Sequence, residues 1–545
     1  MRLHRFGKTS TSTTIIVLLL FATPVAATGF ALTVQHRGGM MHPSGPHGIM
    51  LDPSFSPNAL VGGVPFCFSG RLGTILCYPP QWLTTAYGFP AGLDGTGSSI
   101  VIVDAFGSPT VQADLNTLTT TFGLPATSVT VLCGPTWTGA ASDNCPIKTI
   151  RDLFTPPPPG SNADLCGGVN GMVGWAEETS LDVQAAHAMA PGAKITLVVS
   201  DDCFDTSFNA AELAVVQQAK YHGSIMSQSF GEPDDLVGCL NFPCTVRDPT
   251  IKANADHIYK LAAQNQWTVL ASSGDDGANE ALSAVGTTEL TASWPATNPL
   301  NTAVGGTQGN PYGGQYGPPP GKGISETCAA NTSCNTGIIV INGGPNGCGT
   351  ALRPGFPSSC TPTGYGGEAA WQEFDNFGVR TSSGGGVSSL YPLASYQHQV
   401  PRSYTTLLGQ TVQATGRLTP DLSLSAAIQG GVLIRIGFLS AWGVFGGTSV
   451  SSPSFSAVIA VANQANGGPV GFINPTVYQI GHNKHLYGSS FNDITSGNNS
   501  DTNGQFGVDG YVATTGYDLT TGFGTPKVAA FIGNLLSILQ QNSQQ

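Results

Sequence analysis

The sequence is poor in charged residues, and poorest in basic ones. Only 10% of its 545 residues are Asp, Glu, Lys or Arg, and 20 bases stand against 32 acids, which leaves a net charge of −12. A protein that binds nucleic acid needs a basic surface to neutralise phosphates, so this composition excludes nucleic acid as a partner. Few carboxylates also mean few ion pairs for protonation to break, which is compatible with stability in acid.

Long hydrophobic runs are absent after the N-terminus. The first residues, MRLHRFGKTSTSTTIIVLLLFATPVAATG, have a basic start, an apolar run from about Ile15 to Phe21, and small residues up to Ala27. The run is short for a transmembrane helix, and this order is typical of a secretory signal peptide. We therefore expect a signal peptide over 1–27, a secreted protein and no membrane association after cleavage. An uncleaved N-terminal anchor is the alternative.

No pair of cysteines has the CxxC spacing of a zinc site. The twelve cysteines instead fall in close sequential pairs, and none lies beyond Cys360. In an oxidising compartment this arrangement predicts disulfides that staple surface loops. Spacing alone does not determine connectivity, and our hypothesis for three of the pairs is Cys67–Cys77, Cys133–Cys145 and Cys239–Cys244.

Short apolar runs alternate with helical patterns over most of the chain, which also holds 72 Gly and 38 Pro. Near-continuous apolar strands separated by helices predict an α/β fold with a parallel sheet covered on both faces. One expected strand ends at Asp104, two others cover 193–200 and 224–230, and a fourth runs into a loop within 267–277. The expected helices cover 114–124, 175–190, 210–223, 251–266 and 454–466. Two Cys-, Gly- and Pro-rich insertions interrupt the pattern, at 130–174 and 308–386.

Ser449 is a candidate nucleophile because it lies in GGTSVSSP, between a Gly-rich turn and an apolar helix. A serine needs a base, and no histidine of this chain lies in a His-Gly-Thr helix start of the subtilisin kind. The alternative base is a carboxylate pair, Glu178 and Asp182, in EETSLD. On a helix these residues are neighbours at i and i+4, so one of them holds a proton more tightly. A solvated helix face would explain the same pair without catalysis.

Three motifs in order, ETSLD, SSGDDG and GGTSVSSP, resemble the sedolisin family of serine-carboxyl peptidases. Further stretches such as YGFPAGLDGTGSSIVIVDAFG and YDLTTGFGTP extend the resemblance from about Pro79 to the C-terminal helix. It implies a subtilisin-like α/β fold and cleavage of proteins in acid. By the same resemblance Ser449 is the nucleophile, Glu178 the general base, Asp182 its carboxylate partner and Asp275 the acid of the oxyanion hole. Asp104 matches a position where some members extend the carboxylate network, and structural support is the alternative.

The expected role of Asp275 has a consequence for pH. An oxyanion needs a hydrogen-bond donor, and an ionised carboxylate offers none. Asp275 must therefore be protonated at some stage of the reaction. Because an unperturbed Asp titrates near ~3.9, we expect activity in acid, below roughly pH 5, and a loss of activity towards neutrality.

The resemblance also implies one structural calcium ion near the C-terminus, where FNDITSG and ATTGYDLTTGFG fit. Asp493 and Asp518 would supply carboxylates, and Ile494, Thr514 and Gly516 would supply carbonyl oxygens. Hard oxygen ligands from two separate loops suit Ca²⁺. The alternative is two Gly-rich turns with capping aspartates. Thr514 stands where the family often has Gly, which a backbone ligand tolerates.

One feature departs from the family. Members commonly carry a large folded prosegment, whereas only a polar stretch at 28–65 follows the expected signal peptide here. We expect this stretch to be a flexible leader, followed by a peptidase domain at 66–540 and a tail at 541–545. The leading hypothesis is a secreted, calcium-stabilised, monomeric endopeptidase that acts on proteins or peptides in acid. The competing hypothesis is an exported binding or surface protein that keeps the peptidase fold without turnover.

Overall fold

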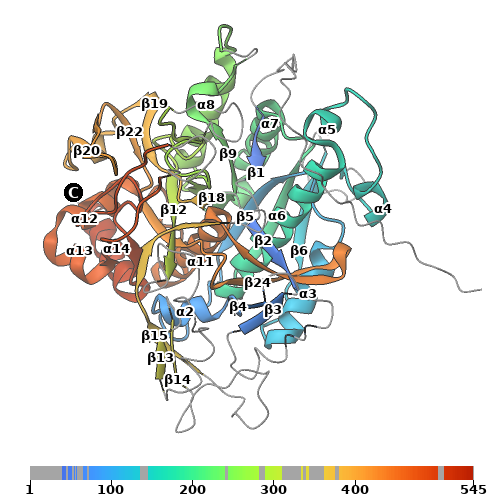
Figure 1. The fold of residues 1–545 in the computed structure, drawn as a ribbon, viewed down its shortest axis with the longest axis horizontal. Coiled ribbons are helices and arrows are strands. Elements are labelled where there is room, and N and C mark those ends of the chain that lie inside the picture. Colours follow the sequence, from blue (N-terminus) through green and yellow to red (C-terminus); the bar gives the residue numbers. More distant parts are fainter. Residues whose placement is uncertain are drawn as a thin grey trace, which may run out of the picture. The chain divides into compact units, whose positions relative to one another are not determined.

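The central feature of the fold is an eight-stranded sheet with the order β16–β12–β10–β8–β5–β7–β6, in which β23 also pairs with β12 (Figure 1). The structure, a computed structural model, describes residues 40–43, 47–51, 55, 57, 66–69, 73–134, 145–239, 244–280, 289–309, 333–335, 339–342, 361–374, 380–500 and 508–543. All strand pairs of this sheet are parallel except β12–β16. Its strands are β5 (Ser99–Ala105), β6 (Val129–Cys133), β7 (Lys194–Ser200), β8 (Ile225–Gln228), β10 (Thr268–Ser272), β12 (Thr302–Gly309), β16 (Glu368–Ala370) and β23 (Leu422–Ser425).

Helices cover both faces of this sheet, and the middle strands are therefore buried at nearly every position. Helices α6 (Gly168–Met189) and α11 (Thr448–Asn466) pack against each other and against the sheet. Helices α7 (Asp205–Val216) and α8 (Pro249–Gln264) form a second packed pair. The predicted α/β fold with a parallel sheet is confirmed. The other helices are α2 (Trp82–Ala86), α3 (Val111–Phe122), α4 (Ile150–Leu153), α5 (Asn162–Leu165), α12 (Asn474–His482), α13 (Lys484–Ser490) and α14 (Val528–Ser543).

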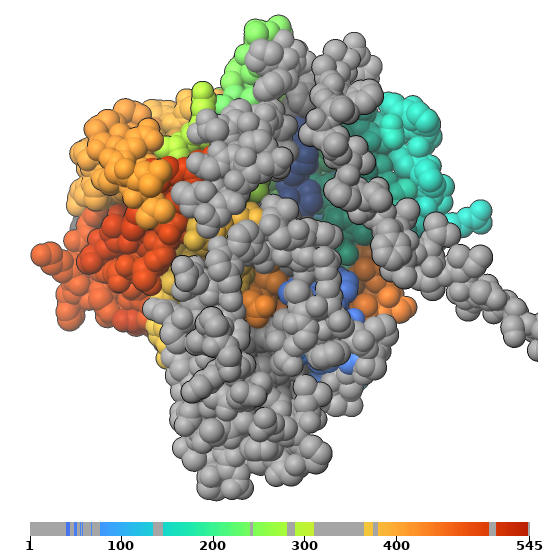
Figure 2. All heavy atoms as spheres, in the orientation of Figure 1, coloured from blue at the N-terminus to red at the C-terminus, as the bar shows by residue number. Residues whose placement is uncertain are grey.

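A five-stranded sheet and several small ones complete the described fold. The five-stranded sheet has the order β2–β25–β24–β4–β3, and a three-stranded sheet has the order β1–β9–β11. Figure 1 shows the C-terminal helices α12, α13 and α14 together at the left of the view, where Figure 2 shows their orange-red to red atoms. The strands outside the main sheet are β1 (His42–Pro43), β2 (His47–Met50), β3 (Phe66–Ser69), β4 (Gly73–Tyr78), β9 (Phe230–Pro233), β11 (Ser293–Trp294), β13 (Ser333–Asn335), β14 (Ile339–Asn342), β15 (Thr361–Tyr365), β17 (Gln372–Phe374), β18 (Arg380–Ser382), β19 (Gly386–Pro392), β20 (Ser403–Thr405), β21 (Thr411–Gln413), β22 (Gly416–Thr419), β24 (Gly431–Ile436), β25 (Ala441–Gly446), β26 (Phe491–Asn492) and β27 (Thr525–Pro526).

The structure differs from the sequence-based expectation in three places. The range 130–174 is not only loop, because it holds most of β6, the short helices α4 and α5, and the start of α6. Helix α11 begins at Thr448, so the Ser-rich stretch expected to be a turn forms its first turns. Helix α14 continues to Ser543, into the expected tail. The expected signal peptide, 1–27, lies outside the described residues.

Four disulfides join cysteines of the described residues, and three of them are the predicted pairs. Cys67–Cys77, Cys133–Cys145 and Cys239–Cys244 are confirmed. The fourth disulfide, Cys166–Cys203, was not predicted, because 37 residues separate its two cysteines. It links the N-terminus of α6 to the loop after β7. No helix in the described ranges is long and apolar enough to cross a bilayer.

Candidate active site

Three neighbouring strands of the main sheet end beside one another, and each end carries a polar residue. Strand β5 ends one residue after Asp104, β8 ends one residue before Ser229, and β10 ends three residues before Asp275. Because β10, β8 and β5 are adjacent and parallel, their carboxyl ends meet at one edge of the sheet. Ligand and active sites of open α/β sheets gather at this edge.

The turn before α11 presents Ser449 at the same edge. Strand β25 ends at Gly446, and Gly447 caps the helix with a φ of 102°, a backbone conformation that favours glycine. Ser449 is the second residue of this 19-residue helix. Its position places the hydroxyl at the positive end of the helix dipole, which stabilises negative charge that develops nearby.

Glu178 and Asp182 come to this serine from α6, which packs along α11. The side chains of Glu178, Asp182 and Ser449 have no exposed surface. The Ser449 hydroxyl interacts with the Glu178 carboxyl and lowers its pKa, although this contact does not reach the geometry of a hydrogen bond. The structure therefore brings the predicted nucleophile and base into contact, and the pair is not a solvated helix face.

Asp182 is linked to the serine through a residue that sequence reasoning missed. The hydroxyl of Ser229 donates a 2.9 Å hydrogen bond to Oδ1 of Asp182, and it lies 3.5 Å from the backbone oxygen of Ser449. Ser229 follows directly on β8, so its place after an apolar strand was the only signal in the sequence. This serine connects the second carboxylate to the backbone of the candidate nucleophile.

Asp275 is held by the residue next to Ser449. The backbone N–H of Thr448 donates to Oδ1 of Asp275 at 2.8 Å, and the Thr448 hydroxyl donates to the same oxygen at 2.6 Å. Asp275 itself is 4% exposed. Thr448 was not singled out from the sequence, although it directly precedes Ser449. Its two bonds fix the predicted oxyanion-hole acid to the N-terminus of α11.

The acids of this cluster hold their protons strongly. Burial, followed by the nearby charge of Asp104, raises the pKa of Glu178 and of Asp182 well above their ordinary values. Burial also raises the pKa of Asp275 well above its ordinary value, while the Thr448 bonds oppose the rise. Burial raises the pKa of Asp104 to about 7. Among the described residues, no lysine or arginine contributes to these pKa shifts. Bound protons therefore reduce the negative charge of the carboxyls.

The N-terminal stretch reaches both borders of this cluster. Strand β1 pairs antiparallel with β9, with His42 opposite Gly231, two residues after Ser229. Strand β2 pairs antiparallel with β25, with His47 opposite Gly446, just before the turn to Ser449. The sequence predicts a flexible leader over 28–65, but its described residues 40–43 and 47–51 lie on sheet edges. Met41, Ile49 and Leu51 contribute to the hydrophobic core.

A hydrogen bond joins the two loops near the C-terminus that hold the expected calcium ligands. The N–H of Gly516 donates to Oδ1 of Asp493 at 3.0 Å, and the N–H of Thr514 donates to Oδ2 of Asp518 at 2.8 Å. Burial raises the pKa of Asp518 to about 7, while backbone N–H bonds from Thr514, Thr520 and Thr521 oppose the rise. Within the described ranges no three His, Cys, Asp or Glu side chains are placed to hold a metal ion together, so carbonyl oxygens would have to complete the site. The donor set fits Ca²⁺.

No protein-family model matches the chain. Among curated proteins it is similar to kumamolisin of Bacillus sp. (strain MN-32), with 30% identity over 432 residues that cover 78% of this chain and 58% of kumamolisin. It is also similar to aorsin of Aspergillus oryzae, with 34% identity over 38% of this chain and 34% of aorsin. Tripeptidyl-peptidase 1 of Homo sapiens is 30% identical over 34% of each chain. The chain thus spans between a third and three fifths of the length of these relatives.

A solved structure shows the same fold. The complex of Pseudomonas sedolisin, a serine-carboxyl proteinase, with two molecules of pseudo-iodotyrostatin aligns with a TM-score of 0.58 and 22% sequence identity. The alignment covers 86% of this chain and 100% of that one. The match therefore covers most of this chain and shows that the fold is shared.

Proposed function

The chain belongs to the sedolisin family, and we propose that it is an acid-acting endopeptidase that cleaves proteins or peptides with Ser449 as nucleophile. The observation that carries this proposal is the contact between Ser449 and Glu178 inside a buried cluster of acids. No described lysine or arginine contributes to the pKa shifts of these acids, so protonation of some of the carboxyls, which acid favours, limits the charge of the cluster while an ionised Glu178 can still accept a proton. The expected signal peptide and the disulfides support secretion into an oxidising compartment.

The proposed reaction begins with attack of the Ser449 hydroxyl on the scissile carbonyl. Glu178 accepts the hydroxyl proton and later gives it to the leaving amine. Asp182 takes part as the partner of Glu178, because two close carboxyls titrate as one coupled system. The bond from Ser229 holds Asp182 in place for this role.

Asp275 would stabilise the oxyanion. Both bonds from Thr448 go to Oδ1 of Asp275, so a proton on this carboxyl belongs on Oδ2. A protonated carboxyl donates a hydrogen bond to the oxyanion, and the raised pKa of Asp275 keeps it protonated in acid. Loss of this proton would remove the donor, which explains why activity should fall towards neutral pH.

We also propose that one structural calcium ion is bound by the carboxylates of Asp493 and Asp518 with the carbonyl oxygens of Ile494, Thr514 and Gly516. Its effect would be on stability, because it would hold together two loops beside α13. The ion takes no part in the proposed reaction, whose steps use side chains alone.

The test of the proposed activity is digestion of an unfolded protein between about pH 3 and 5 by the wild type and by Ser449→Ala. We expect cleavage by the wild type only. Ser451→Ala is a matched control, since Ser451 lies buried in the same helix and its hydroxyl bonds only to backbone oxygens. Equal digestion by wild type and Ser449→Ala would reject Ser449 as nucleophile, and absence of digestion by every variant would favour the binding-protein hypothesis.

A second substrate separates endopeptidase from tripeptidyl-peptidase action, the second of which occurs among the relatives' names. A peptide with a blocked N-terminus can be cut internally by an endopeptidase but offers no free end for tripeptide release. We expect internal cleavage of the blocked peptide. Release of tripeptides from the unblocked peptide alone would overturn the endopeptidase assignment and leave the nucleophile unaffected.

A further inference from the structure

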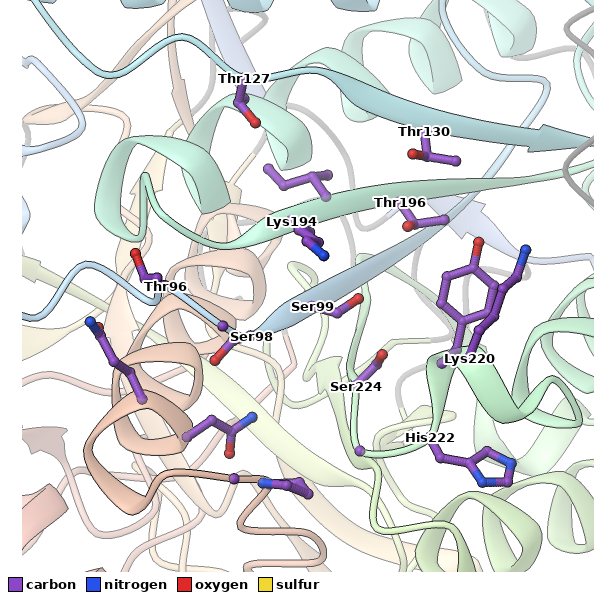
Figure 3. A pocket seen from close by; sticks show the side chains of 18 of the residues that line it. Thr96, Ser98, Ser99, Thr127, Thr130, Lys194, Thr196, Lys220, His222 and Ser224 are labelled. Atoms are coloured by element: carbon purple, nitrogen blue, oxygen red, sulfur yellow. The ribbon is translucent and has the colours of Figure 1, made fainter.

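A cavity of about 740 Å³ lies at the opposite edge of the main sheet from the candidate active site (Figure 3). Its lining includes Ser99 and Lys194, the first residues of β5 and β7, and Ser224, which precedes β8. The acid cluster lies at the carboxyl ends of these same strands. The cavity is therefore a separate feature, and the proposed peptide cleavage makes no use of it.

Basic side chains line this cavity without acidic partners. Lys194, Lys220 and His222 belong to its lining, and none of the described lining residues is an Asp or a Glu. Within the described part of the chain, neither lysine forms an ion pair. The carboxylate of Asp94, which is outside the lining, accepts hydrogen bonds from the N–H and the hydroxyl of the lining residue Thr96. In a chain with a net charge of −12, this cavity is a local concentration of positive charge.

Two residues of the lining are almost fully buried, yet their hydroxyls have no protein partner among the described residues. Thr196 is 4% exposed and Ser224 is 2% exposed, and among the described residues neither side-chain hydroxyl has a hydrogen-bond partner. Figure 3 shows Ser99, Thr196 and Ser224 between Lys194 and Lys220 in that view. Both oxygens have surface open to the cavity, so they can bond to a polar ligand there.

Amide groups add donors on another side of the cavity. Asn463 uses its carbonyl oxygen to accept the N–H of Val470, and Gln464 uses its carbonyl oxygen to accept the N–H of Gly95. These bonds orient the side chains and leave their NH₂ groups as donors. The cavity thus combines cationic groups with several neutral donors and acceptors, and its volume lies within the ~300–1,000 Å³ typical of small-molecule sites.

From this arrangement we infer that the cavity binds a small polyhydroxylated anion, of the class of sugar phosphates and sulfated sugars. Lys194 and Lys220 pair with the oxyanion, which is the interaction that ammonium groups favour. The hydroxyls of Thr196 and Ser224 and the two amides bind the sugar hydroxyls. Neutral sugars lack the oxyanion, and inorganic phosphate lacks the hydroxyls, so each should bind more weakly than the combined ligand.

The experiment uses the full chain with Ser449→Ala, so that binding is measured without proteolysis. Titration calorimetry with glucose 6-phosphate, glucose 6-sulfate, glucose and inorganic phosphate compares the four probes. We expect both charged sugars to bind, and the Lys194→Gln and Lys220→Gln variants each to weaken binding about tenfold, as loss of a charge-assisted bond implies. Lys484→Gln, an exposed lysine of α13 outside the cavity, is the matched control and should bind as the parent does.

Thr196→Val tests the neutral part of the site. It removes an unpartnered hydroxyl with little change of volume, and we expect weaker binding of the charged sugars with unchanged binding of phosphate. The phosphate and sulfate arms show which oxyanion the site prefers. Equal binding of glucose and its charged forms, binding that neither lysine variant changes, or no binding of any probe would overturn the inference. None of these outcomes bears on Ser449.

Discussion

The hydroxyl of Ser229 joins Asp182 to the backbone of the proposed nucleophile: it donates to Oδ1 of Asp182 at 2.9 Å and lies 3.5 Å from the carbonyl oxygen of Ser449. The two residues it connects are 267 positions apart in the chain, yet one hydroxyl bridges them. The bond also favours the ionised form of Asp182, because it lowers the pKa of that carboxyl. Positioning of the proton-accepting pair therefore depends on this serine.

Ser229→Ala should lower kcat about tenfold and leave KM almost unchanged, because one hydrogen bond to a carboxylate is lost. The pKa of Asp182 should rise further, so the pH profile of kcat/KM should shift as well. Steady-state kinetics in acid measure both effects. Ser227→Ala is the control, since Ser227 is buried on the adjacent strand β8 and contacts Ser452 instead. Wild-type kcat and pH profile in Ser229→Ala would contradict the positioning role.

Thr448→Val should extend activity to higher pH while lowering kcat. The Thr448 hydroxyl opposes the raised pKa of Asp275, so its removal leaves Asp275 protonated to a higher pH. The lower kcat follows from the lost anchor at 2.6 Å. Thr448→Ser keeps the hydroxyl and should keep the wild-type profile. An alkaline limb that stays in place in Thr448→Val would argue against Asp275 as the group whose deprotonation ends activity.

The free energy of unfolding should fall as pH rises from about 4 to 8. Burial raises the pKa of Asp104 to about 7, of Glu212 to about 8 and of Asp234 to about 6. A carboxyl with a raised pKa in the folded state binds more protons when folded than when unfolded, so its contribution is present below the unfolded pKa and is lost as pH passes the folded one. Each pKa unit corresponds to roughly 1.4 kcal/mol.

Urea unfolding of the Ser449→Ala chain across this range measures that loss. Glu212→Gln should flatten the pH dependence, because it removes one titrating group while its oxygen can still accept the bond from Gln228. Asp152→Asn should leave the slope unchanged, because Asp152 is an exposed capping residue with a lowered pKa. A free energy of unfolding that rises towards neutral pH would contradict the assignment.

Removal of calcium should lower the melting temperature by several degrees at neutral pH, where chelators work. The ion would neutralise Asp518, whose pKa is raised by burial, and would cross-link the two loops. Asp493→Asn should melt early and lose its response to chelator. Asp509→Asn is the control, because Asp509 binds backbone N–H of Leu408 in the same part of the chain. An unchanged melt after chelation would remove calcium from the proposal.

Displacing β2 should make the active site more reactive. A Cβ on Gly48 would come within 2.4 Å of the Phe445 ring, so Gly48→Val should push this strand off β25. We expect faster labelling of the serine by an active-site reagent, by several-fold or more, because β2 borders the turn to Ser449. Thr405→Val, an exposed strand substitution on β20, should change nothing. Hydrogen exchange would show the displacement of β2 as a loss of amide protection. A wild-type labelling rate despite this loss would contradict a shielding role of β2.

Local patterns predicted the sheet well. The apolar runs that end near Asp104 and at Ser200 each form a buried parallel strand, because continuous burial on two faces leaves a simple mark in the sequence. The helical spacing of Glu178 and Asp182 was also readable, since i and i+4 share a helix face. Motif resemblance then supplied roles that spacing alone left open.

Contacts between distant segments were not readable in the same way. Ser229 and Thr448 reveal their partners only when strands β8 and β10 and helix α11 are placed together. The pairing of β1 and β2 with other strands depends on exposed sheet edges, and a polar, Gly-rich stretch carries no sign of such pairing. The Cys166–Cys203 bridge escaped for the same reason, because the fold and not the spacing brings its ends together.

Helix α11 carries the proposed nucleophile, and every residue from 448 to 463 in it is buried. The same packing contacts would therefore stabilise the fold and position Ser449. Under the proposed activity, a molecule whose α11 unfolds loses its catalytic site as its backbone becomes accessible to cleavage. Intact copies would then digest unfolded copies of the same protein.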